Sequence, residues 1–171
     1  NKKLEDLVEA IYYLSKIEPK IRFIHVGAIG GMESYHALVK AKAKTLGLTN
    51  VEFLNAVPQD VLNACYASAH AFLCLSEHEG FCAPLVEAML HQIPIFALSA
   101  AAVPETLDGA GVLFDQPPNY PVIAESIAEV LHNQSLRDAV IARQDMRVQA
   151  IRNRDLSAEL RSLFSPLLHF S

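Results

Sequence analysis

The sequence contains no tryptophan, only three cysteines and no excess of positive charge. Its formal net charge of −5 at pH 7 argues against nucleic-acid binding, which needs a concentrated basic face. No apolar stretch reaches the ~20 residues of a membrane-spanning helix, and we expect no secretory signal before Leu4. Cys65, Cys74 and Cys82 leave an odd thiol and form no pair with metal-ligand spacing. This pattern indicates a reducing compartment, so we expect a cytoplasmic protein.

The composition is that of one globular domain. A length of 171 residues fits the usual size of a single domain. Hydrophobic residues make up 51% of the chain and charged residues 19%, so the chain can bury a full core. Lysine and arginine gather near the C-terminus, but acidic residues interleave with them, which indicates a solvated helix face.

Short apolar runs alternate with helical patterns along the chain. Apolar residues recur at helical spacing over residues 4–14, and Pro19 ends that helix. We expect buried strands at 21–26, 51–54, 71–75, 94–98 and 112–114, and further helices at 32–46, 58–69, 84–91, from 104, at 122–131 and at 136–153. This order predicts an α/β domain with a doubly wound, Rossmann-like parallel sheet flanked by helices. Such a domain opens with a strand, so we expect this one to lack its first strand.

Residues 75–89 run from a buried strand through a glycine turn into a helix that begins at Pro84. Ala83 would then be the N-cap, and its side chain offers no acceptor. The amides of Cys82, Ala83, Leu85 and Val86 consequently lack an obvious local partner. Free amides at a helix N-terminus favour an anion, ideally a diphosphate. Water could satisfy the same amides, and the sequence does not decide between these interpretations.

Two carboxylates flank this helix start. Glu87 lies one residue too late for a capping box, but one helical turn in it can accept hydrogen bonds from sugar hydroxyls. Glu79 lies in the loop, where it can face a bound sugar. Two surface glutamates are the simpler interpretation. Their placement on a strand–turn–helix unit at the ligand-binding edge of a parallel sheet favours a functional role.

The segment also resembles a known family. Glu79 and Glu87 have the spacing of the E-x7-E motif of the group 1 (family 4-like) retaining glycosyltransferases, which have the two-domain GT-B fold. Residues 76–81 and 84–89 look like the most recognisable stretch of that family, and the likeness covers about residues 2–136. The resemblance implies that this chain is the C-terminal, donor-binding domain of such an enzyme.

Roles follow by position from the resemblance. Glu87 would bind the ribose hydroxyls, Glu79 would contact the donor sugar, and Lys2 would be the phosphate-binding lysine that stabilises the leaving diphosphate. Glu79 and Lys2 are therefore the catalytic candidates. The remaining donor contacts are expected from the backbone of the loop and helix start, from the base-binding turn, and from a turn edging the nucleotide: Gly80, Phe81, Cys82, Ala83, Leu85, Val57 and Gly27.

The sequence departs from the family pattern at three places. Cys82 stands where the family usually has glycine, so the backbone there is less free and a thiol is expected near the sugar. Ala101 and Ala102 replace the usual glycine pair, which affects the donor-sugar loop. The family's phosphate-binding arginine is expected on a strand before Lys2, and this sequence does not contain it.

The activity implied is transfer of a hexosyl group from a UDP-, GDP- or ADP-sugar to a glycan or lipid-linked saccharide, with retention, in polysaccharide biosynthesis. We expect no cofactor and no metal, because the amides and Lys2 would supply the positive charge and no histidine pair has metal-ligand spacing. The acceptor would come from an absent N-terminal domain, as would any contact with the inner face of the cell membrane. This piece alone is therefore expected to be inactive.

Two alternatives remain open from the sequence. The first is a sugar-nucleotide epimerase on the same architecture, which would not need the Glu79–Glu87 arrangement. The second is a non-catalytic nucleotide-sugar-binding domain.

Overall fold

The structure is a computed structural model that describes residues 2–28 and 30–165. The strands are β1 (Phe23–Val26), β2 (Val51–Leu54), β3 (Phe72–Cys74), β4 (Ile95–Leu98) and β5 (Val112–Phe114). The helices are α1 (Leu4–Ile17), α2 (Glu33–Thr45), α3 (Gln59–Ser68), α4 (Ala83–Leu90), α5 (Val103–Leu107), α6 (Tyr120–His132), α7 (Gln134–Arg152) and α8 (Leu156–Phe164). Each expected strand and helix is present in the predicted order. The sequence analysis missed α8, whose N-cap Asp155 accepts a hydrogen bond from the Ala158 amide.

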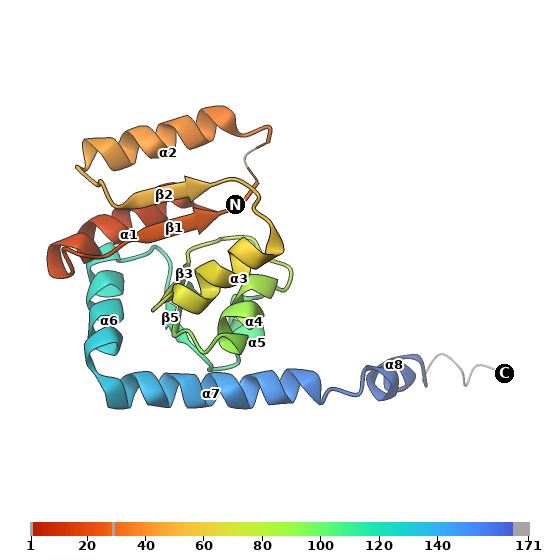
Figure 1. The fold of residues 1–171 in the computed structure, drawn as a ribbon. Helices are drawn as coiled ribbons and strands as arrows, with labels where there is room; N and C mark the ends of the chain where they lie inside the picture. Colours follow the sequence, from red (N-terminus) through yellow and green to blue (C-terminus); the bar gives the residue numbers. More distant parts are fainter. Residues whose placement is uncertain (1, 29, 166–171) are drawn as a thin grey trace.

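All strand pairs are parallel, and the strands are divided between two sheets (Figure 1). In the first sheet β1 pairs with β2, with Phe23 opposite Val51. In the second, β4 lies between β3 and β5, with Phe96 opposite both Leu73 and Val112. Helices pack around both sheets, so the predicted Rossmann-like α/β architecture is confirmed.

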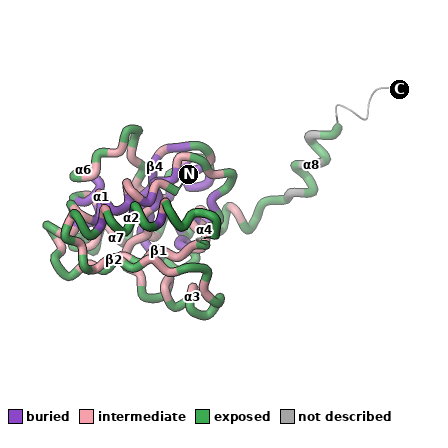
Figure 2. The backbone as a smooth tube through the Cα atoms, turned by 90° about the horizontal axis from the view of Figure 1, so that it is seen from above, coloured by how far each residue is buried: buried purple, intermediate pink, exposed green. Residues whose placement is uncertain are grey.

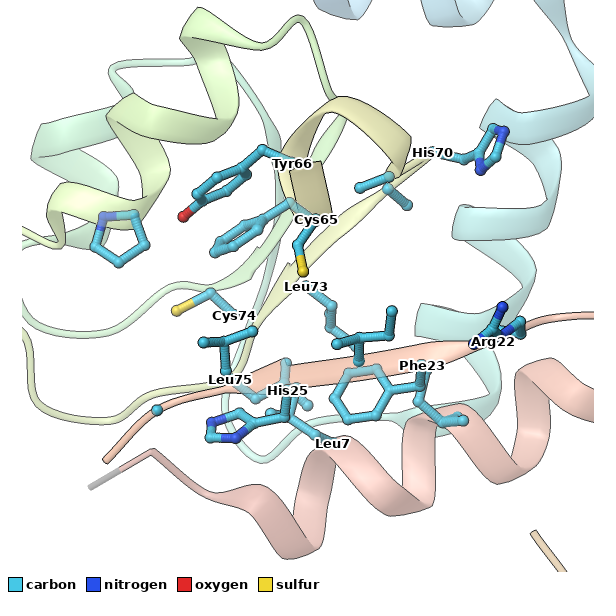
Figure 3. A pocket seen from close by; sticks show the side chains of 18 of the residues that line it. Leu7, Arg22, Phe23, His25, Cys65, Tyr66, His70, Leu73, Cys74 and Leu75 are labelled. Atoms are coloured by element: carbon cyan, nitrogen blue, oxygen red, sulfur yellow. The ribbon is translucent and has the colours of Figure 1, made fainter. Parts of the chain in front are cut away.

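A cavity of about 990 Å³ lies between the two sheets and is lined by residues of both β1 and β3. Figure 3 shows Leu7 of α1, Phe23 of β1 and Leu73 of β3 around this space. The cavity continues to Gly27 and Ser76, just beyond the carboxyl ends of the two strands. Ligands bind at that edge of a parallel α/β sheet.

The strand β4 separates two parts of the hydrophobic core. Phe96 and Leu98 pack in a cluster with α1 and α6, whereas Ile95 and Ala97 pack in a second cluster with α4. Alternate residues of a strand point to opposite faces, so β4 is buried on both sides. This burial explains the continuous apolar sequence of β4, which is typical of parallel strands covered by helices.

The C-terminal helices lie along one side of the molecule. The helix α7 packs against α4 and α6, and the buried side-chain amide of Gln144 donates a hydrogen bond to the Ile93 carbonyl at 2.9 Å. Beyond α7, α8 extends away from the body of the domain (Figure 2). None of the helices in the described part of the chain is long and apolar enough to cross a membrane.

Candidate active site

The loop between β3 and α4 leads into the helix one residue earlier than the sequence suggests. Cys82, rather than Ala83, is the N-cap, and Pro84 is the second helical residue. Cys82 adopts the left-handed conformation, with φ 58° and ψ 62°. Glycine adopts this conformation without the steric cost that a Cβ atom imposes. The left-handed backbone at this position therefore favours the glycine that the family usually has, and Cys82 adopts it with steric strain.

The amide of Leu85 has a local partner, contrary to the sequence-based expectation. It donates to the Cys82 carbonyl at 2.9 Å, in a bond that tightens the first turn of α4. Within residues 2–28 and 30–165, no acceptor pairs with the amides of Cys82 and Ala83. The amides of Cys82 and Ala83 therefore remain as donors for an anion at this helix start. The side chain of Leu85 is fully buried and packs in the hydrophobic core.

Lys2 and Glu79, the two catalytic candidates, are in direct contact. The Lys2 Nζ atom lies 2.5 Å from Glu79 Oε1. The Glu79 side chain is 10% exposed and that of Lys2 is 58% exposed, so the pair closes one edge of the cavity and still reaches solvent. The neighbouring Lys3 pairs with Glu77 at 3.0 Å. The start of α1 is thus joined to the loop before α4 by two adjacent ion pairs.

The contact keeps both members of the pair charged. Partial burial is the largest single influence and disfavours the charged form of each side chain, but hydrogen bonding and charge attraction together outweigh it. As a result the pKa of Lys2 is raised, and that of Glu79, which also bonds Ser76, is lowered. At neutral pH a cation and a carboxylate therefore stand together at the mouth of the cavity.

Glu87 is held by a residue that the sequence analysis missed. The Tyr66 hydroxyl donates a hydrogen bond to Glu87 Oε2 at 2.8 Å, and burial together with this bond raises the pKa of Tyr66. The Tyr66 ring stacks on His91 with ring centroids 5.2 Å apart and on Phe72 at 6.2 Å. Figure 3 shows Tyr66 of α3 at the cavity wall. Its position on a helix far from the motif gives no sequence signal of this role.

Cys74 and Cys82 are brought together at the end of β3 and the start of α4. Their Sγ atoms lie 3.9 Å apart, and both side chains are buried. The hydrogen bond between the thiols lowers the pKa of Cys74 and raises that of Cys82. Folding brings the ligand atoms of Cys74, Cys82 and Glu79 within 4.8 Å of one another, a proximity that the sequence spacing of the cysteines does not indicate.

The remaining predicted residues divide into two groups. The cavity lining includes Lys2, Glu79, Cys82 and Glu87 together with Val57, after β2, and Gly27, after β1. The lining does not include Gly80, Phe81, Ala83 or Leu85. Gly80, Phe81 and Ala83 are exposed along the outer side of the loop, and Phe81 is 50% exposed. The structure thus brings together six of the predicted residues around one cavity.

The donor-sugar loop is tied to the segment that contains Ala101 and Ala102. The Ala102 amide donates to the Glu79 carbonyl at 3.3 Å, and the Thr106 hydroxyl donates to the Phe81 carbonyl at 2.6 Å. Ala101 has a φ of 49°, again in the left-handed region, whereas Ala102 has a φ of −80°. Of the two alanines that replace the family's glycines, only Ala101 therefore adopts a conformation that favours glycine.

Comparisons with known proteins identify relatives of this arrangement. The sequence profile of the family described as glycosyl transferases group 1 matches residues 1–147. The chain is 32% identical to the O-antigen chain mannosyltransferase B of Escherichia coli over 93 residues, which are 54% of this chain and 24% of that protein. It is 28% identical to a phosphatidylinositol N-acetylglucosaminyltransferase subunit of Arabidopsis thaliana, over 96% of this chain and 38% of that protein. The chain thus spans about a quarter and about two-fifths of these relatives.

Solved structures share the fold. The C-terminal domain of a glycosyl transferase group 1 family protein from Francisella tularensis superimposes with a TM-score of 0.75 at 23% identity, covering 87% of this chain and 78% of that one. The Anabaena protein HepE, solved in complex with UDP and glucose, gives a TM-score of 0.76 at 21% identity, covering 94% of this chain and 45% of that one. The architecture is therefore that of the C-terminal domains of GT-B enzymes.

Proposed function

The chain belongs to the glycosyl transferases group 1 family, and from this premise we propose that it binds the nucleotide-diphosphate sugar for an enzyme that transfers the sugar with retention of anomeric configuration. The observation that carries this proposal is the contact of Lys2 with Glu79 in the same cavity lining as Glu87. A cation, a carboxylate facing the sugar and a carboxylate for the ribose are the groups that such a donor requires.

Each group has a place in the transfer. Lys2, with the free amides of Cys82 and Ala83, would bind the diphosphate and stabilise the charge that develops as the sugar–phosphate bond breaks. Glu79 would accept hydrogen bonds from the sugar, and Glu87, oriented by Tyr66, from the ribose. Val57 and Gly27 line the part of the cavity where the base and nucleotide would lie. We assign no metal to this step, because Lys2 and the amides supply the positive charge.

We further propose that the described residues form the C-terminal domain of a GT-B enzyme and that a second domain supplies the acceptor. The support is the fold of this chain and the greater length of its relatives. Those relatives are named for mannosyl and N-acetylglucosaminyl transfer, which supports a hexosyl donor. A glycan or lipid-linked saccharide is the acceptor class that fits their names.

Calorimetric titration of the chain with UDP, GDP and ADP tests the proposal. One of these nucleotides should bind, and Glu87→Ala should weaken its binding at least about tenfold, since hydrogen bonds to a charged group are worth about 1.5–3 kcal/mol. Glu125→Ala is the matched control, because Glu125 is exposed on α6 and is not part of the cavity lining. Absence of binding by all three nucleotides at millimolar concentration would refute the donor-binding role.

A second experiment separates transfer from mere binding. In the complete enzyme, Glu79→Ala should abolish sugar transfer while nucleotide binding persists. Unchanged transfer would remove the role assigned to Glu79, and nucleotide binding without any transfer by the parent enzyme would favour the non-catalytic alternative.

A further inference from the structure

Cys74, Cys82 and Glu79 form a compact group, and the proposed transfer uses only the Glu79 side chain of the three. The three side chains come from the end of β3, the loop and the N-cap of α4, and all of them line the cavity. Their ligand-type atoms lie within 4.8 Å of one another. We propose that this group is a binding site for a thiophilic divalent cation of the zinc class.

The separation of the two sulfur atoms fits such an ion. Two Zn–S bonds of about 2.3 Å at the tetrahedral angle place the sulfurs roughly 3.8 Å apart. The Sγ atoms of Cys74 and Cys82 are 3.9 Å apart. A disulfide would require the sulfurs to approach to about 2.05 Å, far closer than they lie here. The thiols are therefore already spaced for a shared metal.

The type of ligand selects the class of ion. Two thiolates with one carboxylate suit zinc and other thiophilic ions, whereas magnesium and calcium require oxygen ligands. Zinc takes four ligands in a tetrahedron, so a site with three protein ligands leaves one position for water. Both thiols are buried, and Glu79 is 10% exposed on the cavity side, so an ion can enter from the cavity.

The surroundings complete the site electrostatically. Two thiolates and a carboxylate around a divalent ion leave one net negative charge, and Lys2 at 2.5 Å from Glu79 Oε1 neutralises it. Ser76, which is 3% exposed, lies with its hydroxyl 3.6 Å from Cys74 Sγ and can orient that ligand. Outer hydrogen-bond partners of this kind hold metal ligands in place.

Cobalt(II) is the probe that tests the site, with zinc as competitor, on the reduced 171-residue chain under anaerobic conditions. One Co²⁺ per chain should bind and produce thiolate-to-metal charge-transfer absorption together with the visible bands of a tetrahedral ion. Stoichiometric Zn²⁺ should remove these bands, and excess Mg²⁺ should not. Absence of charge-transfer absorption would overturn the proposal.

The variants identify the ligands. Cys82→Gly removes one thiol while suiting the left-handed backbone at that position, so it keeps the fold. This variant and Cys74→Ala should each abolish the charge-transfer absorption, and Glu79→Gln should weaken Zn²⁺ binding about tenfold or more. Cys65→Ala is the matched control, because Cys65 lines the same cavity outside the group. Unchanged absorption in Cys82→Gly, or its loss in Cys65→Ala, would overturn the assignment.

The result does not depend on nucleotide binding. The cobalt and zinc titrations contain no nucleotide, so a chain that binds the metal but none of UDP, GDP and ADP supports the metal site and refutes only the donor role. Metal bound outside the three ligands refutes the site and leaves the donor role standing.

Discussion

The Nζ atom of Lys2 lies 2.5 Å from Oε1 of Glu79, a residue 77 positions further along the chain. The contact joins a residue two positions before α1 to the loop before α4 across the mouth of the cavity. Glu79 therefore holds the ammonium group at the edge where an incoming diphosphate would meet it. The same carboxylate competes with that diphosphate for Lys2. Replacing Lys2 and replacing Glu79 should therefore change nucleotide affinity differently.

Replacing Lys2 should weaken nucleotide binding, whereas replacing Glu79 should not. Lys2→Met removes a charge-assisted hydrogen bond to phosphate, so UDP affinity should fall about tenfold or more. Glu79→Gln frees Lys2 for phosphate, so affinity for the bare nucleotide should stay equal or rise. Calorimetry measures both. Lys3→Met is the matched control, because Lys3 pairs with Glu77 and does not line the cavity. Equal loss in the Lys2 and Lys3 variants would contradict the assignment.

Tyr66 should act on nucleotide binding only through Glu87. Tyr66→Phe keeps the ring stacked on His91 and on Phe72 but removes the hydroxyl that donates to Glu87. Loss of one hydrogen bond, worth about 1 kcal/mol, should weaken nucleotide binding by roughly fivefold. In a Glu87→Ala background the same change should have little effect, because the bond is already absent. An additive loss in the double variant would show that Tyr66 acts independently.

Ala101→Gly should stabilise the domain. Ala101 has a φ of 49°, and the left-handed conformation costs a residue with a Cβ atom about 1 kcal/mol. Glycine at this position should therefore raise the free energy of unfolding by up to about 1 kcal/mol, measured by urea denaturation. Ala102→Gly is the control, since φ at Ala102 is −80° and glycine there only adds freedom to the unfolded chain. Stabilisation by the control rather than by Ala101→Gly would contradict this explanation.

Stability should fall at alkaline pH through two tyrosines. Burial and the hydrogen bonds to Glu5 and Asp6 raise the pKa of Tyr35 and of Tyr120 to about 12 in the folded state, against about 10 in the unfolded chain. Because the folded pKa values are the higher ones, this stabilisation is complete below pH ~10 and is lost as the pH rises toward about 12.

The measurement is the urea midpoint against pH for the parent chain and for the double variant Tyr35→Phe, Tyr120→Phe. The difference between the two isolates the tyrosines from the lysines, which titrate in the same range. The parent should lose more stability than the double variant between pH ~10 and about 12. Parallel curves would show that neither hydroxyl is held protonated by the fold.

Local sequence patterns determined the elements and the motif. The strand β4 is a continuous apolar run because both of its faces are buried. Parallel strands covered on both faces typically have this sequence pattern. The Glu79–Glu87 spacing lies within a single loop and helix, so the sequence alone contains it. The start of α4 was misplaced by one residue because Cys82 adopts a backbone conformation that its residue type disfavours.

Only the tertiary structure decided which distant side chains meet. Nothing local in α3 assigns Tyr66 to Glu87, and nothing in the spacing of Cys74 and Cys82 indicates sulfurs 3.9 Å apart. The contact of Lys2 with Glu79 depends on the residues before α1 lying beside the loop that follows β3. Such contacts arise from the packing of whole helices and strands against one another. A local sequence pattern indicates the type of one helix or strand but not which other element it contacts. The E-x7-E segment could therefore be identified from the sequence, and the family resemblance also pointed to Lys2. The contact of Lys2 with Glu79, the bond from Tyr66 to Glu87 and the proximity of the two thiols could not be identified in this way.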